Sequence, residues 1–270
     1  MKITFLGGGN MAAALVSGML AKGRPPDGIC VIELSAQNRE RLSDRYGVRA
    51  IEAADDAALD CAVFILAVKP QQMKAALTPL AGRLGGAVVV SIAAGLRVTV
   101  IKRWLGGHSR VVRCMPNTPA LIGAGITGLY AEPAVDAAGR EAAETVLGAV
   151  GATVWVEDEP QIDGVTAVSG SGPAYVFNFI EALEAAALEQ GFDARTARRL
   201  ALETVLGAAK LAAASEDSPA TLRERVTSKG GTTEAALKVL AAHDLVGAVG
   251  EAVAAAAQRG RELGDSLGRD

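Results

Sequence analysis

Three small residues near the start of the chain have the spacing of a phosphate-binding turn. Gly7, Gly9 and Ala12 follow an apolar run of strand length and precede an alanine-rich helical pattern. Gly7 would allow a sharp turn, Gly9 a close approach of pyrophosphate, and Ala12 tight packing of helix on strand. The free N–H groups of the helix start would face the phosphates. The pattern predicts a dinucleotide site that comprises Gly7, Gly8, Gly9, Asn10, Met11 and Ala12.

A second helix start in the C-terminal half also combines glycines with hydroxyl groups. Two glycines lead directly into two threonines, and a serine precedes them. Free backbone N–H groups beside hydroxyls suit a small anion such as a carboxylate, although simple N-capping would also explain these residues. We expect a ligand site at Ser228, Gly230, Gly231, Thr232 and Thr233.

A third glycine-rich stretch, residues 168–175, opens the first long helix of the C-terminal half. Its glycines indicate a close backbone contact, either with a ligand or with another helix.

The first half of the chain alternates strand-like and helix-like segments. Strands are expected at residues 29–33, 61–68, 87–92, 110–115, 125–130 and 152–156, with helices at 37–46, 71–80, 98–105 and 133–150. This alternation predicts a doubly wound, mostly parallel sheet of the Rossmann type. Ligands of such sheets lie beyond the carboxyl ends of the strands. Cofactor contacts are therefore also expected from Ala67, Val68, Lys69, Pro70, Ala93 and Asn117.

The residues after the second strand bear on the choice of nicotinamide cofactor. Glu33 would bond ribose hydroxyls and favour NAD, whereas Ser35, Asn38 and Arg39 could hold a 2′-phosphate. We expect NADPH, with NADH as the alternative.

The second half contains no strand pattern. Helices are expected at 174–190, 194–214, 220–225, 232–242 and 245–263, which divides the chain into a dinucleotide-binding domain, 1–160, and an all-helical domain, 161–270. The first of these helices is apolar on all sides at residues 175–180. Such a helix must be buried all round, so we expect this domain to form a subunit interface and the protein to be at least a dimer.

Composition excludes several classes of protein. The net charge is −3 and only 4% of residues are aromatic, which argues against nucleic-acid binding. No apolar run reaches membrane-spanning length, so we expect a cytoplasmic protein.

The scattered cysteines, Cys30, Cys61 and Cys114, argue against a disulfide framework and against a thiolate metal site. Neither His108 nor His243 lies in a motif, so a reaction with little need for proton abstraction fits best.

Several of these motifs, in this order, resemble the pyrroline-5-carboxylate reductases over the whole chain. Besides the 7–12 turn they are the segments 67–70, 115–119, 168–175 and 228–233. The resemblance implies reduction of L-1-pyrroline-5-carboxylate to L-proline, the last step of proline biosynthesis, with NADPH or NADH. It also implies a homodimer formed by the helical domain, as in relatives whose dimers assemble into decamers.

The same resemblance assigns roles to individual residues. Ser228 and the backbone of Gly231 and Thr232 correspond to the carboxylate pocket, and Thr233 to the donor that contacts the imine nitrogen. Lys69 and Glu216 correspond to a lysine and a glutamate that approach each other.

Two other functions are kept as alternatives. A 3-hydroxyacid dehydrogenase-like enzyme would carry its catalytic lysine at the position of Val176. An NAD(P)-binding oligomeric sensor or scaffold would bind the cofactor without turnover.

Overall fold

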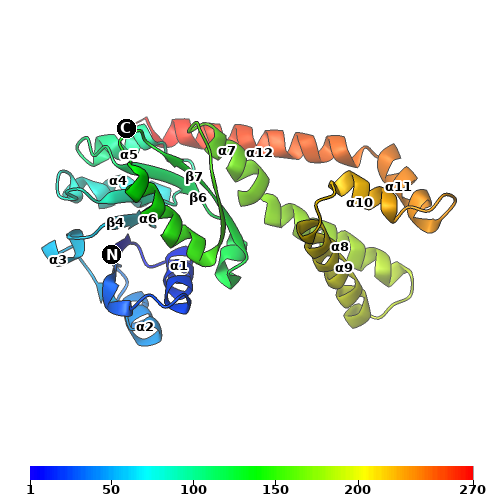
Figure 1. Ribbon diagram of the computed structural model, residues 1–270, viewed down its shortest axis with the longest axis horizontal. Coiled ribbons are helices and arrows are strands. Elements are labelled where there is room, and N and C mark those ends of the chain that lie inside the picture. The colour runs from blue at the N-terminus through cyan, green and yellow to red at the C-terminus, as the bar shows by residue number, and fades with distance from the viewer. Residues whose placement is uncertain (270) are drawn as a thin grey trace. The chain divides into compact units, whose positions relative to one another are not determined.

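The computed structural model describes residues 1–269, which form two compact units (Figure 1). The sheet unit comprises Met1–Ser171 and residues 255–269, and the helical unit comprises Gly172–Ala254. The boundary that we expected after residue 160 falls inside the sheet unit, because the short helix α7 (Gln161–Val165) packs against two strands of the sheet.

The sheet unit contains an eight-stranded sheet in the order β3-β2-β1-β4-β5-β6-β7-β8. The strands β1 to β6 run parallel, β7 is antiparallel to β6, and β8 is parallel to β7, so the predicted mostly parallel sheet is confirmed. The strands are β1 Ile3–Leu6, β2 Ile29–Ile32, β3 Arg49–Ile51, β4 Val63–Leu66, β5 Val88–Ser91, β6 Val111–Met115, β7 Gly125–Ala131 and β8 Gly151–Trp155. The sequence did not predict β3, since three residues with an exposed arginine give no periodic signal.

Helices cover both faces of this sheet (Figure 1). On one face, Ile65 lies in the same core as Leu15 of α1; on the other, Leu66 packs with Met73 of α4. Burial on both faces explains why the central strands are continuous apolar runs rather than alternating ones. Besides α7, the helices that lie wholly in this unit are α1 Asn10–Ala21, α2 Ala36–Tyr46, α3 Asp56–Leu59, α4 Pro70–Leu77, α5 Val98–Trp104 and α6 Ala137–Leu147.

The helical unit contains α8 Gly172–Glu189, α9 Ala194–Ala214, α10 Pro219–Arg225, α11 Thr232–Ala242 and the first part of α12, Leu245–Leu267. The helices α9 and α11 coincide with their predicted bounds, and α12 continues past the predicted end at residue 263.

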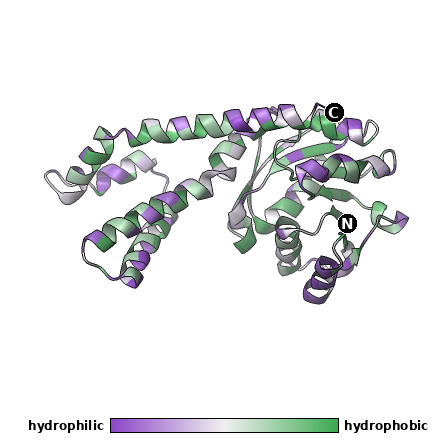
Figure 2. Cartoon of the chain, turned by 180° about the vertical axis from the view of Figure 1, so that it is seen from behind, coloured by the Kyte–Doolittle hydropathy of each residue, from purple (hydrophilic) through white to green (hydrophobic). Residues whose placement is uncertain are grey.

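This unit buries little of its own apolar surface. Among its described residues only Ala197 and Ala201 of α9 are buried apolar side chains, whereas Phe177 is 59% exposed and Phe179 45% exposed. Apolar segments run along its helices in Figure 2. No single helix in residues 1–269 is long and apolar enough to span a membrane; α11 and α12 meet that test only as a pair, bent by 48°.

Candidate functional site

The turn that follows β1 can be made only by glycine. Gly7 has a φ of +103°, and a Cβ at this position would lie 2.9 Å from both the carbonyl carbon and the oxygen of Ala67. Its N–H donates to the carbonyl of Ile32 at 2.8 Å. The turn is therefore fixed between the ends of β2 and β4, where the strand order reverses about β1.

The start of α1 is open on the side where a phosphate would bind. Gly9 precedes the helix, no side chain among residues 1–269 caps it, and no atom lies within 4 Å of the place of a Cβ on Gly9. Ala12 faces the opposite way and is 1% exposed in the core. The first turn of α1 can thus direct its N–H groups at an anion without a competing side chain.

Glu33 stabilises this turn from the end of β2. One carboxylate oxygen, Oε2, accepts a hydrogen bond from the N–H of Gly8 at 2.8 Å. The other, Oε1, accepts from the N–H of Ser35 at 2.9 Å. Because both oxygens are engaged by backbone groups, Glu33 acts as a brace of the turn, a role that its position in the sequence did not reveal.

Arg39 and Ser35 also make local contacts. Arg39 donates to the carbonyl oxygens of Glu33, at 2.8 Å, and Leu34, at 2.7 Å, and pairs with Glu52 at 3.2 Å. Ser35 caps α2 by accepting from the N–H of Asn38 at 3.3 Å. The guanidinium of Arg39, which the sequence suggests for a 2′-phosphate, therefore already makes three contacts with protein groups.

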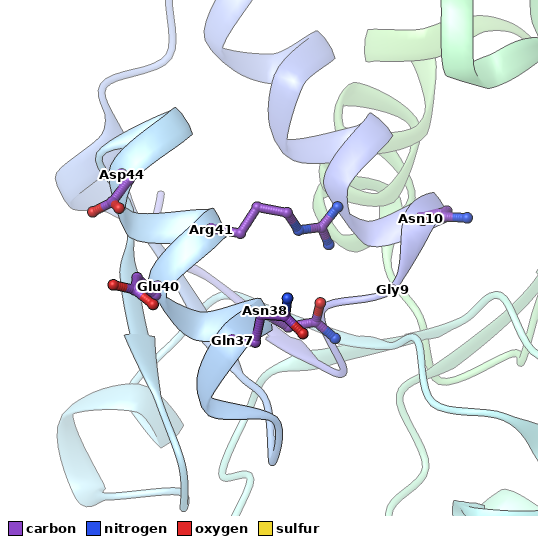
Figure 3. A pocket seen from close by; sticks show the side chains of 7 residues that line it. All are labelled: Gly9, Asn10, Gln37, Asn38, Glu40, Arg41 and Asp44. Carbon is purple, nitrogen blue, oxygen red and sulfur yellow. The ribbon is translucent and has the colours of Figure 1, made fainter.

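A cavity of about 540 Å³ lies between the start of α1 and α2, and it is lined by Gly9, Asn10, Gln37, Asn38, Glu40, Arg41 and Asp44. Figure 3 shows Arg41 reaching across toward α1, whereas Glu40 and Asp44 point away from it. The guanidinium of Arg41 also donates to the carbonyl of Gly8 at 3.3 Å. Sequence reasoning missed Arg41, although it lies three residues after Asn38 and so shares its helix face.

The other strand ends lie at the same edge of the sheet. The N–H of Ala67 donates to the carbonyl of Leu6 at 2.8 Å, which joins this segment to the phosphate turn. Lys69 is exposed and precedes α4, with Pro70 as the first helical residue. Ala93 is 5% exposed after β5.

Asn117 connects two loops through its amide group. Its Nδ2 donates to the carbonyl of Ser169 at 3.1 Å, and its Oδ1 accepts from the N–H of Ile126 at 3.0 Å. The residue is 9% exposed. The amide keeps one further N–H donor and one further acceptor position, so the cofactor contact expected from the sequence stays a prediction.

The glycine-rich stretch before α8 passes close to the end of a strand. A Cβ on Gly170 would lie 2.8 Å from Cε of Met115, at the end of β6. Glycine at position 170 therefore leaves room for the Met115 side chain, and the expected contact with a ligand or another helix stays a prediction.

The second candidate site, in the helical unit, is accessible. Ser228, Gly230 and Thr232 are exposed, while Gly231 and Thr233 are half-buried. Gly231 precedes α11, and no described side chain caps that helix. This is the same open arrangement of N–H groups as at α1.

Glu234 fixes the turn at this site. Its carboxylate accepts from the N–H of Gly230 at 2.6 Å and pairs with Lys238 at 3.1 Å. The N–H of Gly230 and then the Lys238 ammonium hold the pKa of this carboxyl below its ordinary value, because both favour the charged form. Glu216, the predicted partner of Lys69, is exposed in the helical unit, and its role stays a prediction.

The cysteines and histidines lie apart from these sites. Burial raises the pKa of the Cys61 thiol to about 11 and also raises the pKa values of Cys30 and Cys114, so all three are thiols at neutral pH. His108 contacts the carbonyl of Ala87 at the amino end of β5, opposite the phosphate turn, and burial lowers its pKa.

Comparison with known proteins gives consistent matches over the whole chain. Residues 159–263 match the family model "Pyrroline-5-carboxylate reductase dimerisation", and residues 2–95 match "NADP oxidoreductase coenzyme F420-dependent". The sequence is 46% identical to a pyrroline-5-carboxylate reductase of Pseudomonas aeruginosa, over 99% of this chain and 98% of the relative. A relative of the same name from Pasteurella multocida is 42% identical over 97% of both chains.

Solved structures agree. A pyrroline-5-carboxylate reductase from Coxiella burnetii superposes with a TM-score of 0.93 at 44% identity, covering 97% of this chain and 98% of that one. A pyrroline carboxylate reductase from Plasmodium falciparum with NADP bound has a TM-score of 0.85 at 26% identity, covering 98% of each chain.

Proposed function

The chain belongs to the pyrroline-5-carboxylate reductase family, and from that premise we propose how its residues carry out the reaction. The enzyme reduces L-1-pyrroline-5-carboxylate to L-proline with NAD(P)H. The observation that carries this function is the 46% identity to a reductase along the full chain, with both glycine-rich helix starts intact.

The phosphate turn binds the cofactor, which is NADPH, with NADH as an alternative. Residues 7–12 hold the pyrophosphate through the N–H groups at the start of α1. Asn38 and Arg41 bind the 2′-phosphate in the adjoining cavity. Both residues line that cavity, whereas Arg39 does not line it and donates to the carbonyl of Glu33. The segments 67–70 and 93–95 line the nicotinamide half.

The helical unit holds the substrate. The Ser228 hydroxyl and the N–H groups of Gly231 and Thr232 bind the carboxylate, and the Thr233 hydroxyl orients the ring nitrogen by accepting a hydrogen bond from its N–H. Bound NADPH supplies a hydride to the imine carbon, so the C=N bond becomes a C–N bond and the nitrogen keeps the proton of the iminium. A threonine hydroxyl is too weak an acid to protonate a free imine, so Thr233 orients a nitrogen that is protonated in solution. Lys69 and Glu216 are further polar residues of the reaction, in the roles that the family resemblance implies.

The exposed apolar side chains of α8 are the surface of the homodimer. We infer that dimers assemble further, up to a decamer, and that the enzyme acts in the cytoplasm. Light scattering of the purified protein measures the size of the assembly, and cell fractionation measures where the enzyme is located.

One assay separates the proposed enzyme from a sensor or scaffold. Protein, NADPH and pyrroline-5-carboxylate are mixed, and the absorbance of the reduced cofactor is followed, with NADH in a parallel run. Loss of absorbance with proline as product supports the reductase. No loss with either cofactor would leave an NAD(P)-binding protein without turnover.

A further inference from the structure

The loop after β5, from which a cofactor contact is expected at Ala93, packs against the end of α12. Residues 92–97 connect β5 to α5 at the carboxyl edge, next to the loop that follows β4. Ala93 and Gly95 in it are buried, and Gly95 has a φ of +75°. A small displacement of this loop would move the surface against which the nicotinamide half is expected to rest.

The end of α12 lies directly on this loop. A Cβ on Gly95 would lie 3.4 Å from Cβ of Leu263, 3.5 Å from Cδ1 of Leu267 and 3.6 Å from the backbone nitrogen of Gly264. In the opposite direction, a Cβ on Gly264 would lie 3.0 Å from the carbonyl oxygen of Gly95 and 3.3 Å from Nε of Arg97. Gly264 is the buried residue of α12. The contact is thus tight at Gly264, where a Cβ would crowd a carbonyl oxygen, whereas Gly95 is favoured by its left-handed conformation.

Polar contacts also attach this helix end to the last residue of the loop and to α5. The guanidinium of Arg97 pairs with Asp265 at 2.7 Å, and that of Arg103 donates to the carbonyl of Gly268 at 3.0 Å. Arg97 precedes α5 and Arg103 lies in its last turn. The end of α12 is therefore attached to the whole segment from the loop to the end of α5.

We propose that Gly264 is a positioning residue for the cofactor: through its contact with Gly95, the C-terminal turn of α12 sets where the 92–97 loop meets the nicotinamide half of NADPH. The inference rests on the proposed function, since it takes the loop to be part of the cofactor site. An added Cβ at residue 264 must move the Gly95 carbonyl or the helix by a few tenths of an ångström, because a backbone oxygen at 3.0 Å cannot rotate away.

The test compares Gly264→Ala with Gly260→Ala. Gly260 lies one turn earlier in α12, and a Cβ there would meet its nearest atom, Cβ of Asp163, at an ordinary 3.9 Å. Fluorescence titration gives the Kd for NADPH without turnover, and steady-state kinetics give KM for pyrroline-5-carboxylate at saturating NADPH. We expect Gly264→Ala to raise the Kd by about fivefold or more, with KM for the imine changed less than about twofold, and Gly260→Ala to change neither.

A second variant covers the case in which Gly264→Ala does not fold. Leu267→Ala removes packing beneath Gly95 without adding a clash, and we expect it to raise the Kd for NADPH by about two- to threefold. An unchanged Kd in whichever variant folds, or an equal rise of Kd and imine KM, overturns the proposal. Turnover by the unmodified enzyme tests the proposed function separately. Failure of the proposed function can therefore be told apart from failure of the positioning role of Gly264.

Discussion

The two units of this chain solve the problem of burying apolar surface in different ways. The sheet unit encloses Phe5, Phe64 and Ile65 completely, with helices on both faces. The helical unit leaves Phe177 and Phe179 about half exposed. The proposed cofactor site is therefore formed by a unit with its own core, whereas the proposed substrate site is formed by a unit whose apolar side chains need a partner to cover them.

The two glycine-rich helix starts repeat this difference on a smaller scale. At Gly7 a Cβ would collide with the backbone of another loop, whereas at Gly230, with a φ of +73°, no atom lies within 4 Å of the place of a Cβ. The turn at residues 228–231, the proposed substrate turn, is held within its own segment. The carbonyl of Ser228 accepts from the N–H of Gly231, and the carboxylate of Glu234 accepts from the N–H of Gly230. Tertiary packing therefore fixes the conformation of the phosphate turn at residues 7–12, and local contacts fix that of the proposed substrate turn.

The largest predicted effect comes from disrupting the proposed subunit interface on α8 of the helical unit. Phe177→Asp places a charge on the exposed apolar face of α8, and we expect a monomer with activity lowered by more than about a hundredfold. Light scattering and the reductase assay measure both. Gln190→Asp, just after α8 and also exposed, should stay a dimer with normal activity; a dimeric, active Phe177→Asp protein would contradict the comparison.

Alanine substitutions of Gly7 and Gly230 compare the turn that is shaped by tertiary packing with the turn that is shaped by local contacts. Gly7→Ala combines a left-handed conformation with the 2.9 Å contact to Ala67, so we expect a loss of about 2–4 kcal/mol of unfolding free energy and of most NADPH binding. Gly230→Ala meets only the conformational cost, about 1 kcal/mol. Denaturant unfolding and cofactor titration measure the two; equal costs would show that packing around Gly7 adds nothing.

Thr233→Ala tests the chemistry assigned to the helical unit. We expect kcat to fall by about ten- to a hundredfold, since the hydrogen bond that orients the ring nitrogen is lost, while KM for NADPH changes less than about twofold. Thr233→Ser, which keeps the hydroxyl, should recover most of the rate. An unchanged kcat in the alanine variant would remove Thr233 from the mechanism.

Arg41→Gln tests the sheet unit's choice of cofactor. Loss of the guanidinium in the cavity should raise KM for NADPH by about tenfold and leave KM for NADH nearly constant, because only NADPH carries the 2′-phosphate. Arg39→Gln is the matched comparison. If it, rather than Arg41→Gln, changes the ratio of the two KM values, the 2′-phosphate lies on the other side of α2.

The smallest predicted effect is the pH dependence of the substrate turn. The lowered pKa of Glu234 means that its contact with Gly230 is fully present above the ordinary carboxyl range and is lost as the pH falls through the lowered value. KM for the imine should therefore rise by a few-fold as the pH falls below the ordinary range of a glutamate carboxyl, and Glu234→Gln should remove that dependence. A Glu234→Gln enzyme with the same acidic rise would assign the effect to another group.

Much of the fold could be predicted because its signals are local. Central strands buried on both faces are continuous apolar runs, and α9 and α11 were placed at their observed bounds. The short β3 and α3 could not be, since three or four residues show no period and are held by neighbouring elements.

The amino-acid sequence by itself determined the parallel sheet, the two glycine-rich helix starts and the apolar surface of α8, because each follows from residue types a few positions apart. Only the tertiary structure decided that Glu33 braces the turn, that Arg41 rather than Arg39 faces the cavity, and that Gly264 touches Gly95. Those contacts join residues or atoms whose orientation and separation no local pattern encodes, since they arise when strands and helices distant along the chain pack together.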